Sequence, residues 1–143
     1  MSYCRYFLSL ALVLHAVACA TTAGTAQPVS VEIWRRGDDA LTMRFTASVE
    51  EAFKTSGDFV LSRGEKPGSL IVHILNHVDW ERVGERERIH YSIGLDNSDR
   101  QRLGMAEGSC WSDALSECSS EVLRAARVVG AKILPAGEAN HKS

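Results

Sequence analysis

Two cysteines offer the most obvious chemistry in this chain of 143 residues. Cys110 and Cys118 flank seven residues in the stretch GSCWSDALSEC, so they could form a disulfide, a pair of reactive thiols or part of a metal site. Structural zinc needs four ligands, and this pair supplies only two of them. A redox dithiol is usually spaced C-x-x-C at the start of a helix. We therefore expect a structural disulfide, with free thiols and a metal site as the two weaker alternatives.

Histidines are the second candidate, and two of them lie in the strand-like run from Leu70 to Trp80. His73, His77 and Asp79 alternate onto one face of that run, where they could bind a transition metal. Neighbours on one face of a strand are about 6.8 Å apart, and His77 lies at twice that distance from His73, so the spacing contains no chelate. We expect a polar sheet face here, without a metal or another cofactor.

The sequence lacks the common enzyme motifs. It has no Gly-x-Ser-x-Gly elbow, no glycine-rich phosphate loop and no His-Glu-x-x-His pair. A serine, His90 and Asp79 can be drawn as a catalytic triad, but any chain with exposed histidines permits that drawing. The expectation is therefore a protein that is not an enzyme.

The first 20 residues are typical of a signal peptide. Arg5 supplies a positive charge, and the apolar run from Phe7 to Ala18 is too short to cross about 30 Å of hydrocarbon as a helix. Residues 16–19, Ala-Val-Ala-Cys, resemble the lipobox of bacterial lipoproteins and make Cys19 a lipidation candidate. Ordinary cleavage after residue 20 or residue 26 is the alternative. Both place the mature protein in the periplasm, where thiols are oxidised, and acylation of Cys19 would anchor it to the outer membrane.

The rest of the chain is long enough for one domain with one core. We expect a flexible tether over residues 21–28, a single domain over residues 29–134 and a disordered tail over residues 135–143. Loss of the first 26 residues removes Arg5 from the 16 basic residues and none of the 18 acidic ones, which leaves a net charge of −3. This balance gives no indication of nucleic-acid binding.

Hydrophobic periodicity and turn signals predict five strands and two helices. The strands cover residues 29–34, 59–62, 70–80, 86–95 and 100–109. The helices run from the aspartates at 38 and 39 to Gly57, and from Ser112 to Gly130. The order is strand, helix, four strands, helix. The predicted fold is therefore of the α+β class, with both helices on one face of a four- or five-stranded, mainly antiparallel sheet.

A hairpin is the most specific local prediction. Gly84-Glu85 forms a two-residue loop, with glycine first as a type II′ turn requires, between the runs 70–80 and 86–95. In that register Trp80 faces Ile89 and Ile74 faces Leu95, which puts both apolar sets on the same side of the sheet.

In layout the chain resembles a group of small Gram-negative envelope proteins. The resemblance lies in the order of the elements and in the phrase SVEEAFKTSGDFVLS followed by SLIVHI. The chain is similar in this way to the lipopolysaccharide-assembly lipoproteins, the transport-auxiliary lipoproteins and the N-terminal domain of the TolB family. The resemblance implies an accessory role in the envelope, through a protein partner.

Residue types indicate where such a partner would bind. Trp34, Arg35 and Arg36 end the first strand, and tryptophan and arginine are enriched in interface hot spots. The other candidates are Ile71, His73, Leu75 and His77, which share the sheet face without helices. We expect a protein partner on that face or on a sheet edge, and no nucleic acid. The alternative is a periplasmic enzyme inhibitor or immunity protein that acts through the hairpin tip, residues 82–86.

Overall fold

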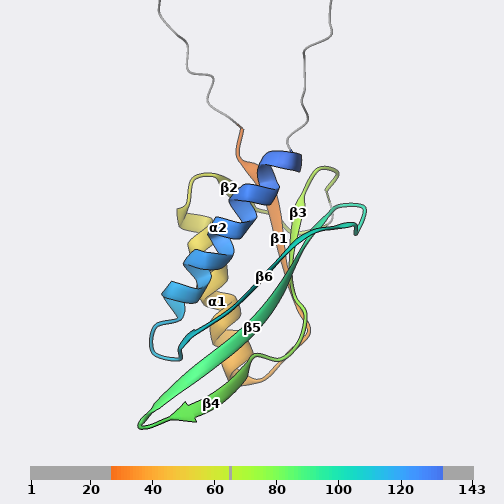
Figure 1. Ribbon diagram of the computed structural model, residues 1–143. Helices are drawn as coiled ribbons and strands as arrows, with labels where there is room; N and C mark the ends of the chain where they lie inside the picture. The colour runs from red at the N-terminus through yellow and green to blue at the C-terminus, as the bar shows by residue number, and fades with distance from the viewer. Residues whose placement is uncertain (1–26, 65, 134–143) are drawn as a thin grey trace, which may run out of the picture.

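The computed structural model describes residues 27–64 and 66–133, which form a sheet and two helices (Figure 1). In chain order the elements are β1 (Val29–Arg35), α1 (Ala40–Thr55), β2 (Phe59–Leu61), β3 (Leu70–Ile74), β4 (Asp79–Val83), β5 (Arg86–Asn97), β6 (Arg102–Trp111) and α2 (Leu115–Ile133). The expected signal peptide, the lipidation candidate Cys19, most of the tether and the tail from residue 135 lie outside the described residues.

The described strands form one six-stranded sheet, and the fold is of the α+β class as predicted. β1 lies between β2 and β3 and pairs with both in parallel, since α1 returns the chain from the end of β1 to the start of β2. β5 pairs antiparallel with β3 and β4 along one side and with β6 along the other. Antiparallel pairs are thus in the majority.

The sheet has one strand more than expected because the run 70–80 is broken. Asp79 pairs with His90 as predicted, but Ile74 pairs with Ile93, two residues away from the predicted Leu95. The four residues 75–78 therefore lie opposite only two residues of β5. They interrupt the strand pairing as a β-bulge does, but with two extra residues. The amide N–H of Leu75 still donates to the carbonyl of Ser92, at 3.3 Å.

The turn between β4 and β5 is the predicted one. Val83 pairs with Arg86, which leaves Gly84 and Glu85 as a two-residue loop. Gly84 has a φ of +65°, and Arg100 is the only non-glycine among the described residues with a positive φ. A positive φ at the first loop position alone identifies a type II′ turn, which suits the right-handed twist of the two strands.

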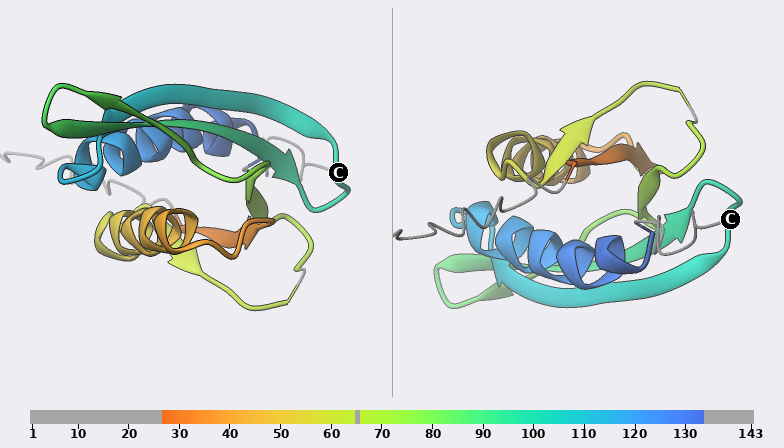
Figure 2. Two further views of the ribbon diagram at one scale, coloured as in Figure 1. Left: turned by 90° about the horizontal axis from the view of Figure 1, so that it is seen from below. Right: turned by 90° about the horizontal axis from the view of Figure 1, so that it is seen from above.

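Both helices pack on one face of the sheet, as predicted, and bury their apolar side chains there. Figure 2 shows α1 beside β1 and β2, and α2 along β5 and β6. The helices contribute Phe45, Val49, Phe53, Val122 and Ala126, which are completely buried. Each large side chain buried in this way contributes about 1.5 to 3 kcal/mol. Neither described helix is long and apolar enough to span a membrane.

The predicted disulfide joins Cys110 to Cys118. Cys110 lies near the end of β6 and Cys118 in the first turn of α2, so the bond fastens the start of the helix to the sheet. Both cysteines are buried within the hydrophobic core. A hydrogen bond between the hydroxyls of Ser48 and Ser119, at 3.0 Å, holds the same part of α2 against α1.

Removal of this disulfide is expected to destabilise the domain. The cysteines are eight positions apart, and closing so short a loop in the unfolded chain corresponds to about 2 to 3 kcal/mol. The double variant Cys110→Ala, Cys118→Ala should therefore unfold at a lower urea concentration than the oxidised wild type. Coincident urea midpoints, measured by circular dichroism, would contradict this expectation.

Candidate functional site

The sheet face without helices, which we call the outer face, brings two of the predicted binding residues together. Trp34 on β1 and His73 on β3 are register partners, and their rings meet edge to face with centroids 6.1 Å apart. The indole N–H of Trp34 donates to the carboxylate of Glu32 at 3.0 Å. Burial lowers the pKa of His73, and the positive charge of Arg36 lowers it further. Both rings are half-buried and held by their neighbours.

The centre of the outer face is closed, which corrects one expectation. Ile71 is only 2% exposed, so it does not lie open for a partner as predicted. Its register partners Glu32 and Asp96 are buried as well. Asp96 forms an ion pair with Arg102, whose guanidinium lies directly over Gly94. These side chains form a packed polar layer.

The other predicted residues do not extend this face into one patch. Leu75 and His77 lie in the irregularity between β3 and β4, where His77 reaches the start of α1 instead of joining His73. Arg35 and Arg36 are exposed at the end of β1, and Arg35 donates to the carbonyl of Gly37 at 3.1 Å. Binding of a partner by these residues stays a prediction.

His77 takes part in a network that ties the strand irregularity to α1. The carboxylate of Asp39 caps the helix by accepting from the amide of Thr42 at 2.9 Å and from its hydroxyl at 2.6 Å. The other contact of Asp39 is with Nδ1 of His77, also at 2.6 Å. The hydroxyl of Thr42 in turn accepts from the amide of Val78 at 2.9 Å. The hydrogen bond to Asp39 raises the pKa of His77, while the hydrogen bonds from Thr42 hold the pKa of Asp39 well below its usual range.

The hairpin tip, the site of the alternative hypothesis, projects beyond the lower ends of the helices in Figure 1. Every residue of β4 is exposed, and two of them are apolar, with Trp80 at 56% and Val83 at 40% exposure. Ion pairs flank the turn, between Arg82 and Glu87 at 3.5 Å and between Arg86 and Asp113 at 2.7 Å.

The edge formed by β6 is the longest free edge of the sheet. Within residues 27–64 and 66–133, this ten-residue strand pairs with β5 alone, so its other side presents unpaired N–H and C=O groups. It has no lysine or proline, the residues that usually protect an edge from another chain. β2 has only three residues, and β4 carries three charges in five, so neither edge suits strand pairing as well.

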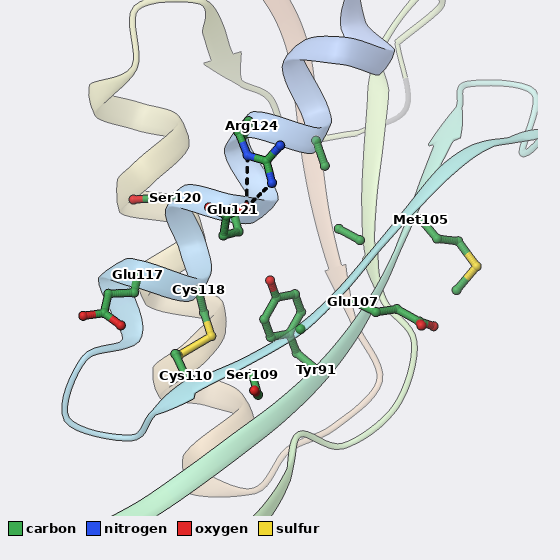
Figure 3. A pocket seen from close by; sticks show the side chains of 13 residues that line it. Tyr91, Met105, Glu107, Ser109, Cys110, Glu117, Cys118, Ser120, Glu121 and Arg124 are labelled. Atoms are coloured by element: carbon green, nitrogen blue, oxygen red, sulfur yellow. Dashed lines mark hydrogen bonds and ion pairs between the residues drawn. A yellow bond between two sulfur atoms is a disulfide. The ribbon is translucent and has the colours of Figure 1, made fainter.

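A groove of about 730 Å³ runs between this edge and the first half of α2 (Figure 3). Two of its lining residues on β6, Ala106 and Gly108, are small and face the helices, because they pair with the buried Ile93 and Tyr91 of β5. Glu117, Glu121 and Arg124 line its α2 side, and Glu107 lies on the strand. With three carboxylates and one guanidinium, these lining residues carry a net charge of −2.

The side chain of Tyr91, which lies on β5 opposite Gly108 of β6, reaches into the groove. Its ring packs on Phe45, with centroids 5.1 Å apart, and crosses Gly108, where a Cβ atom would lie 2.7 Å from the tyrosine oxygen. Figure 3 shows the hydroxyl pointing toward the space beneath α2. Tyr91 is only 7% exposed, and its hydroxyl has no hydrogen-bond partner among the described residues. Burial raises the pKa of this tyrosine and the charge of Glu121 raises it further, so the hydroxyl remains a donor.

The sequence holds only a weak signal for this groove. Two glycines inside a strand indicate a close approach of another group, but the group at Gly108 is known only once Tyr91 is placed opposite it. The described residues contain no cluster of three or more His, Cys, Asp or Glu side chains that could hold a metal ion.

No family model matches this chain, and no curated protein matches it. Solved structures with a similar layout include a minor lipoprotein from Acinetobacter baumannii, with 9% identity, a TM-score of 0.47 and coverage of 76% of this chain and 97% of that one. An uncharacterized lipoprotein B from Nitrosomonas europaea has 11% identity and a TM-score of 0.49, with coverage of 82% and 92%. A PelC dodecamer from Paraburkholderia phytofirmans has 16% identity and a TM-score of 0.43, with coverage of 72% and 83%. The predicted resemblance to Gram-negative lipoproteins is thus found at the level of layout, and at these values it indicates no function.

The contact between His77 and Asp39 predicts a pH-dependent stability. The pKa of His77 is raised above its ordinary 6.5 in the folded state, so its contribution is complete below pH 6.5 and is lost as the pH rises through the raised value. The difference in unfolding free energy between wild type and His77→Gln should therefore shrink from about pH 6 to about pH 9. Asp39→Asn, which keeps a helix cap, should remove the same dependence. A difference that does not change with pH would contradict this.

A second prediction concerns the fit of Tyr91 against Gly108. In Gly108→Ala the new methyl group collides with the tyrosine oxygen, so the urea midpoint should fall. Tyr91→Phe alone should change stability little, because the hydroxyl has no partner to lose. The double variant should recover part of the loss, since the oxygen nearest to the methyl group is gone. Strictly additive midpoint shifts would show that the two residues do not interact.

Proposed function

We propose that this protein is a non-enzymatic accessory protein of the bacterial cell envelope that binds an extended segment of a protein partner at β6. The observation that carries the proposal is the ten-residue strand with a free outer side next to a groove. A strand added to this edge would pair with the open N–H and C=O groups, and its side chains would enter the groove. Main-chain pairing provides affinity in this mode of binding, and the groove provides selectivity.

The envelope part of the proposal is supported by the N-terminal sequence and by the disulfide. Residues 1–20 have the charge and the apolar run of a signal peptide, and Cys19 follows a lipobox-like stretch. The bond between Cys110 and Cys118 suits a compartment that oxidises thiols.

The rigidity of the site supports binding without a large rearrangement. The disulfide fixes the start of α2 against β6, and Phe45 holds the ring of Tyr91. Because both walls of the groove are fixed before a partner arrives, little conformational entropy is lost at the site on binding.

The hairpin tip supports the second candidate function, which is inhibition of an enzyme. Trp80 and Val83 are exposed on a projecting, tightly turned hairpin, and such an element can enter a concave site. Charged residues around the hairpin tip limit the apolar area that it offers to an enzyme. Inhibition is therefore the second candidate function.

Photo-crosslinking in the native host separates the two candidates. A benzoylphenylalanine is placed at Met105 on β6, at Val83 on the hairpin or at Val60 on β2, all three of which are exposed apolar positions. We expect a covalent adduct with one envelope protein from Met105 and none from Val60, the matched control on the opposite edge. An adduct from Val83 alone would favour the inhibitor, and the absence of an adduct at Met105 would contradict strand addition.

A further inference from the structure

The two faces of β6 place different demands on a strand that pairs with it. Side chains alternate along an extended segment, so every second one points into the groove and the others point to the outer face. On the groove side the neighbours on β6 are Gly104, Ala106 and Gly108. The end at Gly104 is closed by Val129, which a Cβ atom on this glycine would meet at 3.0 Å. The ring of Tyr91 already covers Gly108, so the free room lies beside Ala106 and beneath α2.

Large apolar side chains fit this room. The small residues of β6 leave the space that a large side chain of an added strand would fill, as the ring of Tyr91 already does across Gly108 from the other side. The hydroxyl of Tyr91 points into this space without a partner, so it can donate to a polar group of the added segment.

On the outer face the neighbours are Met105, Glu107 and Ser109. Glu107 is exposed and accepts from the hydroxyl of Ser92 at 3.1 Å, which holds the carboxylate over the strand. Opposite charges directly across two strands stabilise the pairing and like charges weaken it. A basic side chain on the added segment is therefore favoured beside Glu107. Glu117, on the α2 side of the groove, acts in the same direction.

We infer that β6 binds an extended segment which places large apolar side chains in the groove and a lysine or arginine beside Glu107. This inference rests on the proposed strand addition and names the chemistry of the partner. A second copy of this chain is a poorer occupant, because β6 pairing with another β6 would bring two acidic grooves together.

Three blocked pentapeptides test the inference on the full-length, oxidised protein labelled with ¹⁵N. Their sequences are threonine-phenylalanine-X-phenylalanine-threonine, with lysine or glutamate as X, and threonine-alanine-lysine-alanine-threonine. We expect the lysine-phenylalanine peptide to shift the amide signals of β6 and to bind about fivefold or more tightly than the other two. Glu107→Lys should reverse the preference between lysine and glutamate, whereas Glu85→Lys, a matched change at the exposed hairpin tip, should leave it unchanged.

Each remaining outcome overturns the inference. Shifts on β6 without a preference for lysine, or with a preference that Glu107→Lys does not reverse, would show strand addition without the inferred chemistry, so the proposed function would survive alone. Shifts confined to β2 or β4, or no shifts up to about 1 mM peptide, would reject the inferred partner. The Met105 crosslink would then decide the proposed function independently. Signals that broaden with protein concentration alone would indicate a second copy as the occupant.

Discussion

Strand β5 is the constraint on which the rest of the structure depends. It is the longest strand, and it pairs with β3, β4 and β6 at once. Its alternation puts Ile89, Tyr91, Ile93 and Leu95 on the helix side, which fixes the face where both helices must pack. A shift of one residue along β5 would turn these side chains to the outer face, so the hydrophobic core itself enforces the register.

The candidate site is a consequence of this register. Tyr91 is buried because it belongs to the apolar set of β5, and Gly108 lies opposite because the β5–β6 pairing places it there. A residue with a Cβ at that position would force the ring away. The disulfide then holds α2 at a fixed place over the same strands, so that the groove, its acidic rim and the free edge are one arrangement. Packing defines this surface.

Much of the fold could be predicted because local signals agree with one another. The stripes of Phe45, Val49 and Phe53 on α1, the turn at Gly84 and the cysteine pair each have a strong physical cause in the sequence. The break at residues 75–78 could not be predicted, since an excess of two residues preserves the alternation of period two on both sides of it. The hydrophobic periodicity of β1 and β3 also does not reveal that these two strands pair in parallel. The groove depends on the cross-strand pair of Tyr91 and Gly108, and this pair can be recognised only after the register of β5 and β6 is known.

The place of β1 in the sheet also bears on the order in which the chain can fold. The first strand lies between β2 and β3, and its residue Val31 pairs with Leu61 and with Leu70, which come 30 and 39 positions later. The hairpin of β4 and β5, in contrast, closes over two residues. Non-local pairing requires the entropy of loop closure to be lost before any contact compensates for it, so local hairpins form fast and β1 joins late. Until β3 is available, β1 has only the three-residue β2 to pair with, so the parallel part of the sheet is completed only after the chain has been made beyond Leu70.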